Sequence, residues 1–181
     1  SCLVSILPGM AQTEKLTDYV NPFVGTDGYG NVYPGAQIPF GGIQISPDTD
    51  SRFYDAASGY KYNHLTLMGF SLTHLSGTGI PDLGDFLFIP GTGEMKLEPG
   101  THEDPDQGYR SRYSHDKEWA SPNYYAVELA DYGVKAEMTS GVRSGMFRFT
   151  YPESDNAFIM IDMNHTLWQS CEWSNLRMIN D

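Results

Sequence analysis

The sequence predicts an all-β fold, an antiparallel β-sandwich. Short segments alternate apolar and polar residues, which is typical of half-buried strands. Turn residues, among the chain's 19 Gly and 11 Pro, separate these segments at close spacing, and no helical period persists for three turns. A length of 181 residues suits one domain with a sizeable core, and we expect it to span residues 13–181.

The N-terminal residues 1–12 predict a signal-peptide remnant. An apolar run over residues 2–10 precedes Ala11 and a polar stretch, as at the end of a secretory signal cleaved near Ala11. Cys2 leaves open the alternative of a lipid anchor. Both interpretations predict export to the periplasm or the cell surface. No stretch reaches the ~20 apolar residues of a membrane-spanning helix.

The first predicted strand covers residues 41–46 and ends in a turn at Pro47. Asp48, Asp50 and Asp55 resemble a calcium loop in composition. Phe53 and Gly59 stand where an EF-hand loop starting at Asp48 requires Gly and Glu, so we interpret the three aspartates as turn residues.

The remaining elements follow from the same alternation. Residues 86–89 predict a buried strand closed by residues 90–93, and residues 98–107 predict a surface loop. Residues 109–115 alternate, and residues 124–130 and 134–139 predict a hairpin around a turn at 131–133. Two more strands are expected at residues 146–151 and 157–163.

The composition of the chain argues against some classes of binding partner. The net charge of −12, from 11 Lys and Arg against 23 Asp and Glu, argues against nucleic acid and anionic membranes. Aromatic residues make up 13% of the chain, including 12 Tyr and 3 Trp. Such rings suit either sugar binding or a β-rich core, and composition leaves both open.

One stretch, residues 69–85 (GFSLTHLSGTGIPDLGD), gathers hydroxyl and acidic side chains around three glycines. Glycine allows a ligand to approach the backbone closely, and hydroxyls can bind a polar, hydroxyl-rich ligand. The stretch lacks the GxxxxGK[ST] pattern of a phosphate loop. The alternative is a tight turn between two strands.

This stretch resembles a signature of the family 92 glycoside hydrolases, the calcium-dependent exo-acting α-mannosidases. The resemblance extends to residues 19–39 (YVNPFVGTDGYGNVYPGAQIP), 40–49, 113–125 (YSHDKEWASPNYY) and 134–152, in the family's order. One departure is Phe147, which stands where members usually have a histidine before Arg148. The resemblance implies an N-terminal β-sandwich followed by a large helical domain.

The resemblance also implies where the chemistry lies. The catalytic acid and base and the calcium ligands are expected in the helical domain, outside this chain, so we expect no catalytic or metal-binding residue here and no activity of this fragment alone. The N-terminal domain would form one wall of the sugar pocket. Its expected substrate-binding residues are Phe23, Gly77, Thr78 and Gly79.

Other side chains are expected to support this wall. His74, Asp82 and Asp85 would hold the loop's shape, and His115 and Glu118 match a family pair expected to order the turn at residues 120–122. For Phe23 a core position is the alternative, and Trp119 is either a stacking platform or a packing residue.

The sequence therefore favours part of an exported exo-acting α-mannosidase that hydrolyses terminal α-linked mannose from glycans with inversion. Calcium is the cofactor implied for the full-length enzyme, and the implied partners are a mannose-containing glycan and the chain's own C-terminal helical domain. The alternatives are a non-catalytic carbohydrate-binding β-sandwich and a structural export domain.

Overall fold

A computed structural model describes residues 14–51 and 54–179, and the predicted signal-peptide remnant lies outside these ranges. The strands in the described residues are β1 (Ser46–Asp48), β2 (Thr66–Leu67), β3 (Gly69–Ser71), β4 (Leu87–Thr92), β5 (Ser111–Arg112), β6 (Glu118–Ser121), β7 (Tyr124–Leu129), β8 (Val134–Ser140), β9 (Gly145–Thr150) and β10 (Ala157–Asp162). Short 3-10 helices are η1 (Leu16–Tyr19), η2 (Tyr54–Ala56), η3 (Pro105–Gln107) and η4 (His115–Lys117). Among the described residues, no helix has the length and apolar character needed to cross a membrane.

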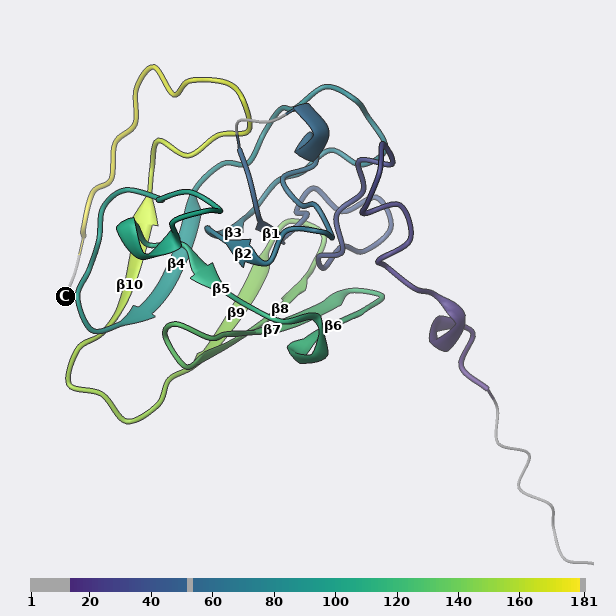
Figure 1. Cartoon of the computed structure of the whole chain (residues 1–181). Helices are drawn as coiled ribbons and strands as arrows, with labels where there is room; N and C mark the ends of the chain where they lie inside the picture. The colour runs from purple at the N-terminus through teal and green to yellow at the C-terminus, as the bar shows by residue number, and fades with distance from the viewer. Residues whose placement is uncertain (1–13, 52–53, 180–181) are drawn as a thin grey trace, which may run out of the picture.

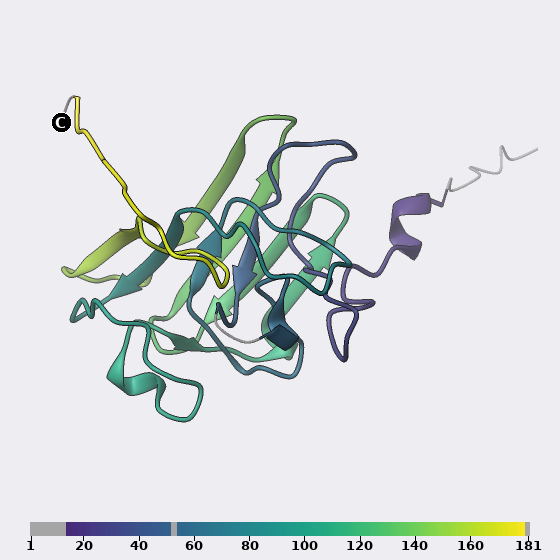
Figure 2. The same ribbon diagram turned by 90° about the horizontal axis from the view of Figure 1, so that it is seen from above.

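The predicted antiparallel β-sandwich is confirmed. One sheet has the strand order β1-β3-β4-β10 and the other β6-β7-β8-β9, while β2 and β5 pair separately. Every strand pair in these sheets is antiparallel. The two larger sheets form separate layers in Figure 1, and in the view from above the sheet that contains β3 and β4 overlies the other (Figure 2).

The main core lies between these layers. Alternate residues of β7 and β8 point inward, and Val127 faces Ala136 across the pair. From the other sheet Phe70 of β3 reaches the same core and contacts Phe147 and Phe149, with ring centroids 6.4 and 6.2 Å apart. Burial of these apolar side chains, at about 25 cal/mol per Å², is the main force holding the layers together.

A second, smaller core lies on the other side of β4. Leu87 and Ile89 pack there with Met68 and Tyr109, and the partly buried Met160 of β10 packs against them. Phe88, between Leu87 and Ile89, instead contacts Phe147 with ring centroids 5.0 Å apart, so β4 packs on both of its faces.

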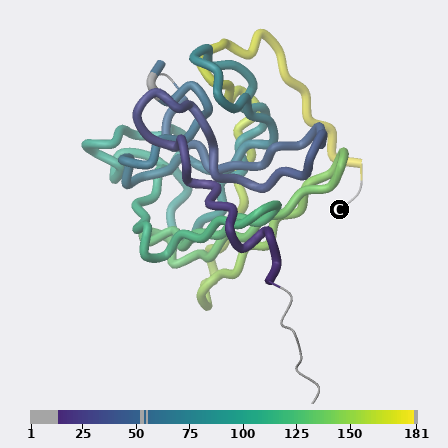
Figure 3. Tube along the Cα trace, turned by 90° about the vertical axis from the view of Figure 1, so that its right-hand side faces the viewer, coloured from purple at the N-terminus to yellow at the C-terminus, as the bar shows by residue number. Residues whose placement is uncertain are grey.

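Loops over residues 20–40 cover one side of the sandwich, seen toward the viewer in Figure 3. Backbone hydrogen bonds hold these loops in place: the Val32 amide donates to the Gly25 carbonyl within them, and the Tyr62 amide donates to the Thr26 carbonyl over 2.9 Å. These contacts bring the N-terminal loops beside the segment that leads into β2.

The first strand differs from its predicted position. Residues 41–46 were expected to form it, but β1 runs from Ser46 to Asp48 and includes Pro47. Proline has no amide hydrogen to donate and is accepted on edge strands, and β1 is an edge of its sheet. The prediction of turn residues is therefore wrong for Asp48, which lies in a strand and is buried.

The later strands match their predictions more closely. The hairpin of β7 and β8, and strands β9 and β10, lie within a residue or two of the expected bounds. Strand β4 continues through Pro90 to Thr92, beyond its expected end, because β10 pairs along its whole length. Within residues 109–115 only Ser111–Arg112 is a strand, and β6 was not predicted.

Candidate functional site

The central loop, residues 72–86, connects β3 to β4 as a narrow hairpin. The Gly84 amide donates to the Thr73 carbonyl over 2.9 Å, and an isolated bridge joins His74 to Leu83. Gly84 has φ +81°, and an added Cβ would lie 2.7 Å from Cγ of Leu167. Only glycine satisfies both the backbone angle and this close approach, so the base of the hairpin is held in one shape.

The tip of the loop presents backbone to open space. The Gly77 amide donates to the Asn31 carbonyl over 2.7 Å, and this bond ties the tip to the N-terminal loops. Gly77 has φ +74°, and an added Cβ would meet nothing within 4 Å. Gly79 has no positive φ, and its nearest atom would be Oη of Tyr54 at 3.5 Å. Thr78, between them, is exposed.

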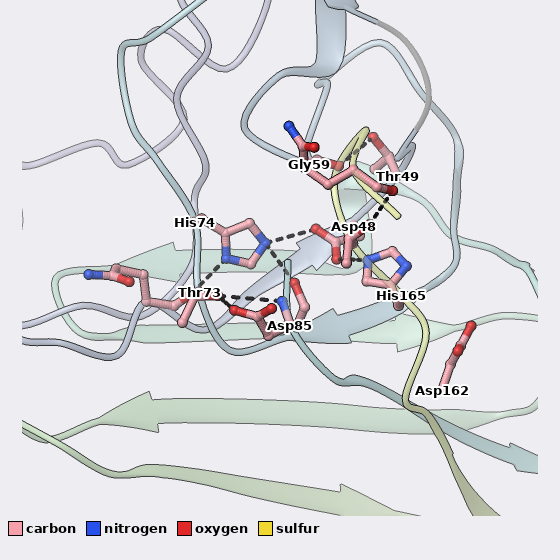
Figure 4. A network of polar contacts seen from close by, with 12 residues as sticks. Asp48, Thr49, Gly59, Thr73, His74, Asp85, Asp162 and His165 are labelled. Atoms are coloured by element: carbon pink, nitrogen blue, oxygen red, sulfur yellow. Dashed lines mark hydrogen bonds and ion pairs between the residues drawn. The ribbon is translucent and has the colours of Figure 1, made fainter. Parts of the chain in front are cut away.

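A buried carboxylate lies under this loop (Figure 4). Oδ1 of Asp48 accepts a hydrogen bond from Nε2 of His74 over 2.8 Å, and Oδ2 accepts one from Nε2 of His165 over 2.7 Å. The side chains of Asp48 and His74 are fully buried, and His165 is nearly so. Strand β1, the central loop and the C-terminal segment therefore meet at one residue.

Each ring nitrogen of His74 faces a hydrogen-bond acceptor. Nδ1 lies 2.6 Å from the carbonyl oxygen of Gln44, and Nε2 faces the carboxylate of Asp48. Each ring nitrogen is therefore placed to donate a hydrogen bond. Burial alone would raise the pKa of Asp48, but the positive charge of His74 and the hydrogen bond of His165 hold it below its ordinary value.

The two loop aspartates are exposed. Asp82 accepts a hydrogen bond from the amide of Leu83 over 2.8 Å. Asp85 accepts the hydroxyl of Thr73 over 2.9 Å rather than a loop amide. Because water can replace these bonds, each is worth less than a buried bond of the same length.

A second cluster forms around Tyr62. Its ring stacks on His115 with centroids 3.9 Å apart and planes 6° apart, and Phe23 meets it edge-on at 5.8 Å. Phe23 is partly buried and also packs against the main core. Of these three rings, that of Tyr62 is the most exposed to solvent, at 38% for the residue.

Glu118 anchors this cluster from beneath. Its fully buried carboxylate accepts hydrogen bonds from His115 at 2.6 Å, Tyr125 at 2.5 Å and Tyr60 at 2.9 Å. Burial, with the negative charge of Glu118, raises the pKa of Tyr125 well above its ordinary value, so this phenol remains a donor. His115 and Glu118 thus fasten η4 and β6 to the core, whereas Asn123 holds the turn after β6 by bonds to Ser140.

The structure gathers the predicted residues into two groups. Gly77, Thr78 and Gly79 lie at the loop tip with His74 beneath them, while Phe23 joins His115 and Glu118 through Tyr62. The loop over residues 25–32 connects the groups, since it bonds to Tyr62 at one point and to Gly77 at another.

Sequence reasoning missed Asp48, His165 and Tyr62. Asp48 was hidden in a run of aspartates after a proline, and His165 lies 117 residues from its partner. The only signal for Tyr62 was its place beside Tyr60 in an aromatic-rich stretch. None of these features predicts a contact without the sheet order.

The described residues contain no group of three or more His, Cys, Asp or Glu side chains placed to hold a metal ion. Asp48 and Glu118, the two buried carboxylates described above, are already bonded to histidine or tyrosine. What the described site offers is exposed backbone amides, hydroxyls and an aromatic face, which suit binding of a polyhydroxylated ligand.

Comparison with known proteins gives consistent matches. Residues 19–181 match the glycosyl hydrolase family 92 N-terminal domain. An uncharacterized secreted glycosidase of Arthroderma benhamiae is 30% identical over 139 residues, which are 76% of this chain and 17% of that protein.

Two solved structures share the fold. The family GH92 glycosyl hydrolase ccman5 superposes with a TM-score of 0.70 at 31% identity, and the family GH92 inverting mannosidase BT2199 of Bacteroides thetaiotaomicron with 0.66 at 27%. Each match covers 83% of this chain and 20% of the other. The chain thus spans about a fifth of the length of these relatives.

Proposed function

The chain belongs to glycosyl hydrolase family 92, of which it carries the N-terminal domain, and from this we propose that it is part of an exported exo-acting α-mannosidase. The enzyme would remove terminal α-linked mannose from glycans with inversion. In this proposal the domain forms one wall of the sugar pocket, and the chain's own C-terminal helical domain forms the other. The proposal assigns the catalytic carboxylates to that helical domain, outside this chain.

The open backbone at the loop tip supports this role most directly. A Cβ added to Gly77 would meet no atom within 4 Å, and one added to Gly79 would meet only Oη of Tyr54 at 3.5 Å, Nδ2 of Asn31 at 3.9 Å and Cε1 of Tyr54 at 4.0 Å. A sugar can therefore come close to the main chain between them and bond to its amides. Thr78 adds a hydroxyl at the same point.

A binding wall also has to be rigid, and the network beneath the loop supplies this. His74 follows β3 by three residues and is fixed on both ring nitrogens, to Gln44 and to Asp48. Fixing a loop before the ligand arrives reduces the entropy lost on binding. In the proposal Asp48, His74 and His165 are positioning residues, because their buried side chains lie beneath the loop rather than at its exposed tip.

The loops around the tip carry apolar side chains that are open to solvent. Val24, Tyr29, Tyr54 and Ile80 are each more than half exposed, Tyr29 at 93%. Apolar side chains gathered in this way mark surfaces that other protein or ligand covers. They support contact with the helical domain and with the glycan on this side of the sandwich.

Calcium remains a prediction for the full-length enzyme. Because the described residues offer no ligand cluster for a metal, the proposal routes no step through calcium in this domain. The contribution of this chain is to bind and orient the terminal sugar, and water exclusion would follow from closure against the second domain.

The test is Gly79→Val in the full-length enzyme. Gly79 has no positive φ, so the substitution fills the sugar's space without straining the backbone. We expect kcat/KM for a simple aryl α-mannoside to fall about 10- to 100-fold, the usual effect of misplacing a substrate. Phe23→Ala is a weaker probe, because Phe23 also packs on the core and its loss lowers stability.

The matched control is Gly42→Val. Gly42 is exposed, has no positive φ and would place its Cβ 3.6 Å from the Val142 carbonyl, outside the central loop. This variant should keep wild-type kinetics. Equal kinetics for both variants and the wild type would show that the central loop is only a connection between strands. Absence of any α-mannoside hydrolysis by the wild-type enzyme would reject the proposed activity itself.

A further inference from the structure

The outer face of the β6–β9 sheet forms a second ordered surface. This sheet is the lower layer in Figure 1, and its inward residues build the core. The strand register aligns two rows of outward side chains: Glu128, Lys135 and Thr150; and Trp119, Ala126, Glu137 and Arg148. Beyond them Ser121 pairs with Tyr124, and Thr139 pairs with Met146. Lys117, at the end of η4, joins the first row through its ion pair with Glu128. This face lies on the opposite side of its sheet from the main core.

Trp119 stands at one end of the second row and is 45% exposed. The structure therefore decides against a fully buried packing role for this residue. Nζ of Lys135 lies 5.8 Å from the centroid of its ring, which fixes the ring by a cation–π contact. A half-exposed, oriented indole on a flat sheet provides an apolar plane beside polar groups.

The charges on this face pair with one another. Lys117 bonds to Glu128 over 2.5 Å, and Lys135 lies 3.5 Å from Glu137. Arg148 donates two hydrogen bonds to Glu137, over 2.6 and 2.8 Å. The surface therefore presents many fixed donors and acceptors with little net charge, although the chain as a whole is strongly acidic.

A groove of about 630 Å³ adjoins the row of Lys117, Glu128 and Lys135. It continues over the turn between β7 and β8 to Tyr151 and Pro152, and apolar atoms form most of its lining. An elongated ligand with apolar ring faces and polar edges fits such a groove. A strong polyanion would have to break the ion pairs in order to bind. A flat apolar partner would bury these charges, which is costly, so neither partner suits this surface.

We infer that this outer face is a second glycan-binding surface, separate from the loop tip. Its ligand is a neutral oligosaccharide or polysaccharide, with one sugar stacked on Trp119 and neighbouring hydroxyls bonded to Lys135, Glu128 and Arg148. The surface would hold the protein on a polymeric glycan while the central loop receives a chain end. This role needs no catalytic group.

The test is affinity electrophoresis of the full-length protein through gels that contain neutral yeast α-mannan or anionic polygalacturonate. Mannan should retard the wild type, and Trp119→Ala should raise the apparent Kd for mannan about tenfold. Trp119→Phe should restore most of it. The matched control is Trp173→Ala, which removes an indole that is 80% exposed in the C-terminal segment.

Two further measurements separate this surface from the loop tip. Trp119→Ala should hydrolyse a small aryl α-mannoside at the wild-type rate. Gly79→Val should show the lowered kcat/KM described above and keep its retardation by mannan. Far-ultraviolet dichroism verifies that each variant is folded. The inference is overturned if mannan does not retard the wild type, if Trp119→Ala is retarded equally, or if only polygalacturonate binds.

Discussion

The substitution Asp48→Asn tests whether the buried carboxylate holds the central loop in place. Asp48 accepts one hydrogen bond from His74 at 2.8 Å and another from His165 at 2.7 Å, in a site without solvent access. An asparagine has the same shape but only one acceptor atom. Its amide group would place two donors against each other at one of the two histidines.

The expected loss is large for a single residue. Removing one partner of a buried ion pair costs about 3–5 kcal/mol, a substantial share of the roughly 5–15 kcal/mol that stabilises a typical domain. For a chain of this size each kcal/mol lowers Tm by about 2–4 °C, so Tm should fall by roughly 6–20 °C. Thermal unfolding followed by circular dichroism at pH 7 measures this shift.

The matched control is Asp85→Asn. Asp85 is exposed and accepts the hydroxyl of Thr73, so the same chemical change should cost less than about 1 kcal/mol. The pH dependence adds a second check, because the folded-state pKa of Asp48 is depressed. Its contribution is complete above the unfolded value near ~3.9 and is lost as the pH falls further, so the Asp48→Asn difference should shrink in acid. Equal Tm values for the two variants at pH 7 would refute the reasoning.

Three further outcomes are expected. Glu118→Gln should lower the free energy of unfolding by about 3 kcal/mol in urea titrations, because the buried carboxylate accepts from three donors, and a shift below 1 kcal/mol would contradict this. Gly84→Ala should be strongly destabilising in the same assay, whereas Gly28→Ala, also at positive φ but without atoms within 4 Å, should show only the smaller backbone cost. Hydrogen bonds from Arg148 lower the pKa of Glu137 to about 2. This pair should therefore stabilise the fold above about pH 4.5 and lose its effect as the pH falls toward 2. A Glu137→Gln variant whose stability depends on pH as the wild type's does would contradict this.

Local patterns were enough for much of the fold. The hairpin of β7 and β8 and strands β9 and β10 followed from alternation between turn residues, because strand faces and turn chemistry depend on neighbours in sequence. The resemblance carried by the glycine-rich loop and its flanking motifs led to the correct family. Strand β1 was misplaced because Pro47 signals a turn locally, and only the edge position of the strand makes it acceptable there.

The sequence by itself determined the all-β class, the later strands and the composition of the central loop. The tertiary structure decided which buried groups meet. Asp48 finds His74 at a separation of 26 residues and His165 at 117, and Glu118 finds Tyr60 at 58. A buried charge is stable only beside a partner, and which partner stands there depends on how the strands are ordered in space, which no local pattern encodes.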